Sequence, residues 1–98
     1  MAPLDKEGAV TDAGNMGDQM QQAYHNADVL LRRFGASLDD VVEEVVYTLD
    51  IDAAFQAAGP VRKAAYGRSD PQVASTLVGV TRLAIPGQLV EIKMIARV

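Results

Sequence analysis

Cysteine and tryptophan are absent from the 98-residue chain, and there is only one histidine. The lack of cysteine excludes disulfides, thiol catalysis and cysteine-ligated metal sites. No apolar stretch approaches the roughly 20 residues that cross a bilayer, and the chain does not open with a charged segment followed by an apolar one. These features predict a soluble, cytoplasmic protein without a membrane partner.

Positive charge is also scarce. Nine Lys and Arg residues stand against 13 Asp and Glu residues, which gives a formal net charge of −4. Nonspecific nucleic-acid binding depends mainly on Lys and Arg neutralising phosphates, so no nucleic-acid partner is expected. The length and the hydrophobic content of 49% fit a single domain over residues 1–98 with one modest core.

Two segments carry helical periodicity. In residues 15–34 apolar side chains recur at three- and four-residue steps, and Asn15 is the expected N-cap. A second helix is predicted over residues 52–66, with Asp52 as its N-cap. Pro60 lies inside this helix and removes a backbone donor, so either a kink or two short helices are expected there.

Three segments predict strands. Residues 41–49 are rich in valine, which favours the pleated surface of a sheet. Residues 76–82 and 89–98 flank a Pro-Gly turn and predict a β-hairpin, and the second of them alternates between an apolar and a mixed face. The order helix, strand, helix, strand, strand predicts an α+β two-layer sandwich, in which two helices cover one face of a mixed sheet.

The other face of this sheet is expected to carry apolar side chains, among them Leu89 and Ile95. A monomer would leave that face in water, so self-association is expected. Glu91 lies in the same strand, where an ionised carboxylate needs a partner, water or a chemical role. Either Glu91 orients water in a site, or it is an edge acid paired with Lys93, Arg97 or a neighbouring subunit.

Other acid–base candidates have simpler interpretations. His25 lies in the polar sector of the first helix without a second histidine, so a surface position is expected. Glu43 and Glu44 are adjacent in a strand and therefore diverge to opposite faces, which disfavours a paired-carboxylate site. At least one of the two must lie at an edge, an interface or a hydrated patch.

Three stretches resemble the RidA/YjgF family, whose members are also described as L-PSP endoribonucleases. They are residues 35–42 (GASLDDVV), residues 49–52 (LDID) followed by Phe55, and residues 89–92 (LVEI). The resemblance implies a chorismate-mutase-like fold and a homotrimer with small-molecule sites in clefts between subunits. It also implies cofactor-free hydrolysis of imines or enamines to 2-oxo acids and ammonia.

Carried over residue by residue, the resemblance assigns the family's water-orienting strand glutamate to Glu91. Ser75 stands where the family has an arginine that binds the substrate carboxylate, and the expected ligand-binding residues are Ser75, Thr76 and Leu77. Without that bidentate arginine, hydrolysis of carboxylate-bearing imines is expected to be poor. The family also begins with a strand pair ahead of the site. The chain is therefore expected to be N-terminally short, or to have its sheet completed by another chain.

Three classes of function remain open. The first is a RidA-like hydrolase with a changed substrate, and the second is a ligand-binding or structural trimer without the chemistry. The third is the ribonuclease activity in the family's description, which the acidic charge and the lack of a basic or aromatic patch disfavour. The missing arginine separates the first two classes. Its absence disfavours the hydrolase, unless the substrate has no carboxylate for an arginine to bind.

Overall fold

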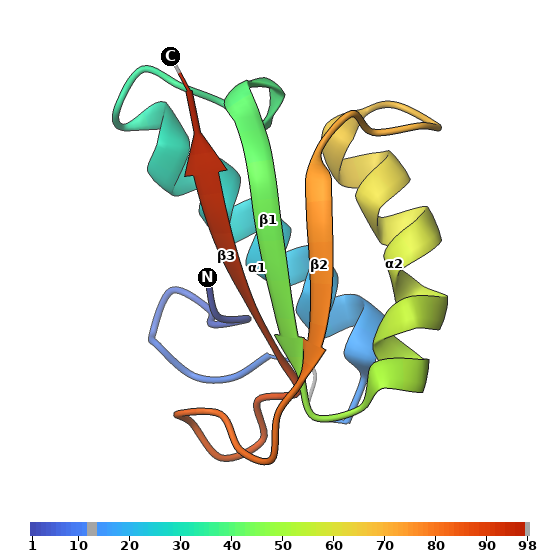
Figure 1. Ribbon diagram of the computed structural model, residues 1–98. Coiled ribbons are helices and arrows are strands. Elements are labelled where there is room, and N and C mark those ends of the chain that lie inside the picture. Colours follow the sequence, from blue (N-terminus) through green and yellow to red (C-terminus); the bar gives the residue numbers. More distant parts are fainter. Residues whose placement is uncertain (12–13, 98) are drawn as a thin grey trace.

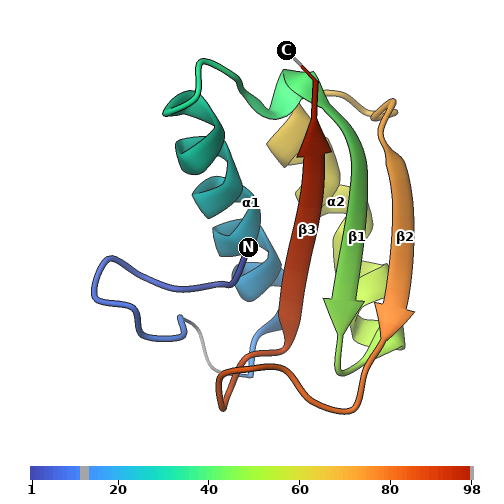
Figure 2. The ribbon, with the colours of Figure 1, turned by 60° about the vertical axis from the view of Figure 1, so that its left-hand side comes forward.

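The computed structural model describes residues 1–11 and 14–97. Both helices pack on one face of a three-stranded sheet (Figures 1 and 2). This arrangement confirms the predicted α+β two-layer sandwich. None of the described helices is both long enough and apolar enough to cross a membrane. The elements in chain order are α1 (Met16–Arg32), the 3-10 turn η1 (Leu38–Asp40), β1 (Val41–Thr48), α2 (Ile51–Tyr66), β2 (Ala74–Gly79) and β3 (Val90–Ala96).

The central strand of the sheet is β1, and the strand order is β2-β1-β3. β2 runs parallel to β1, as the strand–helix–strand order predicts, and β3 runs antiparallel to β1. The predicted hairpin between the last two strands is wrong, because β2 and β3 lie on opposite sides of β1. Residues 80–89, with their Pro-Gly turn, instead pass beyond the end of β1 (Figure 1).

The physical reason for this error is the reach of the connection. Crossing one strand requires roughly 10 Å, since neighbouring strands are about 4.8 Å apart. Residues 80–89 span that distance easily. The side chain of Gln19 fixes their path against α1: its Nε2 donates to the Gly87 carbonyl at 2.9 Å, and its Oε1 accepts from the Leu89 N–H at 2.8 Å.

The helix boundaries follow local capping. Asn15 caps α1 as predicted, whereas α2 is capped by Asp50 rather than by Asp52. α2 runs unbroken through Pro60, so the alternative of two short helices is wrong. Pro60 and Gln56, whose carbonyl loses its helical partner, are both exposed, so water can take the place of the missing N–H.

The core lies between the sheet and the two helices. The predicted alternation of β3 is confirmed, because Val90 and Ile92 are fully buried while the residue between them faces away from the helices. Four polar side chains are also buried: Gln19, Glu44, Thr48 and Gln88. Among the described residues, no buried side-chain nitrogen or oxygen lacks a hydrogen-bond partner. The apolar core consists of Met16, Met20, Ala23, Tyr24, Leu38, Val41, Val46, Ala54, Tyr66, Val90 and Ile92.

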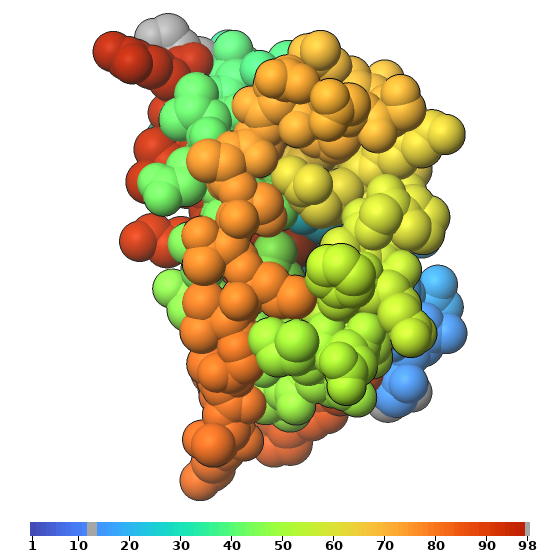
Figure 3. Space-filling view, turned by 45° about the vertical axis from the view of Figure 1, so that its right-hand side comes forward, coloured from blue at the N-terminus to red at the C-terminus, as the bar shows by residue number. Residues whose placement is uncertain are grey.

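The two edges of the sheet differ. The N-terminal segment lies along β3, where the Ile92 N–H donates to the Met1 carbonyl at 2.9 Å and the Met1 ammonium donates to the Ile92 carbonyl (Figure 2). Asn26 of α1 holds this segment through its Nδ2, which donates to the carbonyls of Ala2 and Leu4. The outer edge of β2 pairs with no other strand of the described chain, and Figure 3 shows it beside α2. Such an edge favours association.

Candidate functional site

The strand registers assign each predicted site residue to one face of the sheet. Glu44 contacts side chains from both helices and pairs with Ser75 across the sheet, so Ser75 lies on the helix face. Leu77 lies two residues further along β2, on the same face, and packs against the core. Thr76 lies on the opposite face, which neither helix covers and which is called the open face below.

Side chains on the open face form rows across the three strands. One row contains Thr76, Val45 and Lys93, and the next contains Val78, Tyr47 and Glu91. Thr76 and Glu91 therefore share a face, but they lie in adjacent rows on strands separated by β1, roughly 12 Å apart. Of the four predicted site residues, two lie on the open face and two on the helix face.

The Glu91 carboxylate is accessible and oriented. Its side chain is 36% exposed, and its Oε2 lies 2.8 Å from the Met1 ammonium. Its Oε1 accepts a hydrogen bond of 2.7 Å from Nε2 of Gln88. Within residues 1–11 and 14–97, no ion pair joins Glu91 to Lys93 or Arg97. An oriented carboxylate of this kind can accept a hydrogen bond from water or from a ligand N–H.

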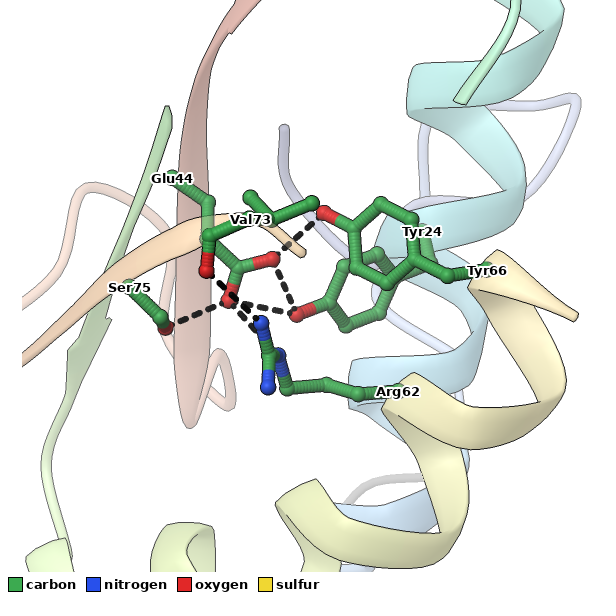
Figure 4. Close-up of polar contacts among 6 residues, drawn as sticks. All are labelled: Tyr24, Glu44, Arg62, Tyr66, Val73 and Ser75. Carbon is green, nitrogen blue, oxygen red and sulfur yellow. Dashed lines mark hydrogen bonds and ion pairs between the residues drawn. The ribbon is translucent and has the colours of Figure 1, made fainter. Parts of the chain in front are cut away.

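A second carboxylate, Glu44, is fully buried between the sheet and the helices (Figure 4). Tyr24 of α1 donates to both of its oxygens at 2.9 Å, and Tyr66 of α2 donates to Oε1 at 2.5 Å. Arg62 Nε at 3.1 Å and Ser75 Oγ at 2.7 Å donate to Oε2. These five residues, called the Glu44 cluster below, join α1, α2, β1 and β2.

The chemistry of the Glu44 cluster is that of a saturated acceptor. Burial, together with the negative charge and hydrogen bonding of Glu44, raises the pKa of Tyr24 and of Tyr66 above the usual tyrosine value. Both hydroxyls therefore remain protonated donors at neutral pH. The Arg62 guanidinium lies over the Tyr66 ring, 5.6 Å from its centroid. A carboxylate has about four lone-pair sites, so Glu44 has none left for a substrate.

Sequence reasoning anticipated only part of this cluster. The divergence of the two adjacent glutamates is confirmed, because Glu43 is exposed and Glu44 is buried. The role of Glu44 as an acceptor from both helices was not anticipated. The available signal was a glutamate at a helix-facing strand position, together with tyrosines on the buried sides of both helices, Tyr24 and Tyr66.

The grooves elsewhere on the described chain include two that border α1. One of about 210 Å³ runs between α1 and α2 and is lined partly by Tyr24 and Asp28, and another of about 690 Å³ lies between the N-terminal segment and α1. The predicted surface residue His25 is exposed and borders both. Neither groove is lined by Glu91 or Thr76. In the part of the chain that the structure describes, no group of three His, Asp or Glu residues could hold a metal ion.

Comparisons with known proteins identify the family. The family model described as Endoribonuclease L-PSP matches residues 1–98. A RutC family protein from Pyrococcus abyssi is 33% identical over 94 residues, which are 96% of this chain and 71% of that protein.

Solved structures agree. YyfB from Yersinia pestis, a member of the conserved Rid family, matches with a TM-score of 0.86 at 27% identity, over 99% of this chain and 73% of that one. E. coli TdcF with bound serine matches with a TM-score of 0.82 at 22% identity, over 97% of this chain and 73% of that one, and shows a likeness of fold alone. On the family-model match and the Pyrococcus relative, the chain belongs to the RidA/YjgF family, described as Endoribonuclease L-PSP.

Proposed function

We propose that the protein binds a small metabolite on the open face beside Glu91, and that Glu91 orients the water that hydrolyses a C–N bond in an imine or enamine. The observation that carries this proposal is the Glu91 carboxylate itself. It is 36% exposed on the face without helices, and one of its oxygens is held by a buried amide. Water adds to the C=N carbon, and the products are a carbonyl compound and ammonia or an amine.

The binding cleft is completed by further copies of the chain, in a homotrimer. Three points support this assembly: the resemblance to the family, the edge of β2 that no other described strand pairs with, and apolar side chains exposed on the open face. Ile95 is 46% exposed there, in the same strand as Glu91. Because Thr76 and Glu91 lie roughly 12 Å apart in one chain, a neighbouring chain is needed to close a small cleft around either of them.

The residues around Glu91 define the substrate class. No arginine lies on β2, and Thr76 offers a single neutral hydroxyl on the open face. Lys93 lies on the same face as a point charge, without the fork that binds a carboxylate bidentately. The Glu91 carboxylate also repels an anion at close range. The preferred substrate is therefore a small imine or enamine without a carboxylate, and 2-iminopropanoate and 2-iminobutanoate are poor substrates.

A coupled assay tests this function. An amino-acid oxidase generates 2-iminopropanoate, an amine oxidase generates imines without a carboxylate, and ammonia release is followed with and without the protein. We expect clear acceleration only for the second kind of imine. Glu91→Gln should abolish it, and the matched control Glu43→Gln, an exposed acid on β1, should retain it. No acceleration with any imine would refute the enzymatic function.

A non-catalytic ligand-binding trimer is the second candidate, and the absence of an arginine on β2 favours it. Saturation-transfer NMR with small amino acids, 2-oxo acids and amides tests binding directly. Serine is the first probe, because TdcF, a protein of the same fold, was solved with bound serine. Binding that Glu91→Gln removes, without hydrolysis of any imine, would favour this candidate over the enzyme.

A further inference from the structure

A buried glutamine contacts Glu91. Gln88 lies in the connection between β2 and β3, is 1% exposed, and donates from Nε2 to Oε1 of Glu91 at 2.7 Å. Its Nε2 also donates to the Val90 carbonyl at 3.0 Å, and its Oε1 accepts from the Ile85 N–H at 3.3 Å. Two acceptors on one side and a donor on the other permit only this orientation of the amide.

The position of Gln88 is itself fixed from the helix layer. Gln19 of α1 is fully buried and bonds to the backbone on both sides of Gln88, at the Gly87 carbonyl and at the Leu89 N–H. The Gln88 side chain therefore has little freedom to follow Glu91 if that carboxylate moves. The position of the Glu91 carboxylate is therefore set by the Gln88 Nε2 donor, which is already fixed.

We propose that Gln88 is the positioning residue of Glu91: it holds Oε1, so that Oε2, which lies 2.8 Å from the Met1 ammonium, is the oxygen with which Glu91 contacts a water or a ligand. The contact between the two side chains stands on its own, whereas its catalytic consequence rests on the proposed function. Ordering a glutamate side chain costs conformational entropy. Because the fixed Gln88 amide already orders Glu91, less of this entropy has to be lost when the substrate reacts. The polar or charged groups near Glu91 include the Met1 ammonium, and Tyr47 and Lys93 on the open face.

NMR of the labelled protein tests the contact without any ligand. In Gln88→Leu, we expect the side-chain carboxylate carbon of Glu91 to change its chemical shift. The control Gln72→Leu, which removes an exposed amide that donates to Asp70, should leave that shift unchanged. In Glu91→Gln, a conservative change at a partly exposed position, the side-chain amide protons of Gln88 should shift upfield. If neither resonance responds to the change at the other residue, the proposal is refuted.

The imine assay tests the consequence of the contact. Because the Gln88 amide donates to a charged group, Gln88→Leu should lower kcat by on the order of tenfold, with a smaller change in KM. The same substitution should add no further loss in a Glu91→Gln background. An NMR response in a protein without hydrolytic activity would support the positioning contact and refute the hydrolase function. An active protein whose kcat is unaffected by Gln88→Leu would overturn the positioning role alone.

Discussion

Replacing Arg62 by methionine probes the Glu44 cluster. The substitution keeps an unbranched side chain with an apolar stem, but it removes the guanidinium whose Nε lies 3.1 Å from Oε2 of Glu44. The Glu44 side chain is 0% exposed and the Arg62 side chain is 20% exposed. Among the described residues Arg62 is the one ion-pair partner of Glu44. A buried carboxylate would therefore be left without a compensating charge.

The expected loss of stability follows from this burial. Breaking a buried ion pair by removing one partner costs about 3–5 kcal/mol. The hydroxyl donors Tyr24, Tyr66 and Ser75 stay in place, so we expect the lower end of that range, about 3 kcal/mol. In a chain of this size, each kcal/mol lowers Tm by about 4–8 °C, which gives a fall of about 12–24 °C.

Urea unfolding followed by circular dichroism measures this loss. Tyr66→Phe removes one donor to the same carboxylate and should lower the free energy of unfolding by about 1.5–3 kcal/mol. Tyr47→Phe, on the open face and outside the Glu44 cluster, is the matched control and should change it by less than about 0.5 kcal/mol. A loss below about 1 kcal/mol for Arg62→Met would refute the view that Glu44 is a buried charge held by Arg62.

Three further predictions concern pH, assembly and chemistry. Burial and the neighbouring carboxylate raise the pKa of Tyr24 and of Tyr66 in the folded chain, so their stabilisation is complete below pH 10 and is lost above it, where unfolded tyrosines ionise. The free energy of unfolding should fall by about 1.4 kcal/mol per pH unit for each tyrosine, and a flat profile to about pH 11.5 in urea titrations would contradict this. Light scattering at micromolar concentration should give the mass of a trimer, and a monomer mass would exclude the proposed cleft. Thr76→Arg should raise hydrolysis of 2-iminopropanoate in a manner that depends on Glu91, whereas Ser75→Arg, on the helix face, should not.

The fold was predictable where the pattern in the sequence is local. Periodicity over residues 15–34 anticipated α1 within two residues at its C-terminal end, and alternation in residues 89–98 gave the correct buried face of β3. The pairing of strands, in contrast, depends on residues that are far apart in the sequence. A Pro-Gly turn indicates that the chain reverses, but it does not say which strand comes next in the sheet. The central strand of the sheet is β1, which has buried residues along most of its length and pairs with a strand on each side.

The candidate site was harder to predict for a related reason. Strand side chains alternate with a period of two, so an uncertainty of one residue along β2 exchanges the two faces of the sheet. Ser75, predicted to bind ligand, donates to Glu44 on the helix face, while its neighbour Thr76 lies on the open face. The donors to Glu44 lie 18 to 31 residues away from it in the chain. Only the tertiary structure brings them together.

Glu44 and Glu91 lie on neighbouring strands, yet their surroundings give them opposite roles. Donors from three other elements saturate Glu44, whereas the partly exposed Glu91 has one oxygen held by Gln88 and the other beside the Met1 ammonium. The bond of 2.7 Å from Ser75 to Glu44 ties β2 to the helices and so turns Thr76 to the opposite side of the sheet. Changes in the Glu44 cluster should therefore reach the open face through β2, while changes at Gln88 should reach it through β3. Combined variants of Arg62 and Gln88 should then be nearly additive in ligand affinity, since they act on different strands. A combined effect on ligand affinity that differs strongly from the sum of the two single effects would show that the Arg62 and Gln88 variants do not act independently.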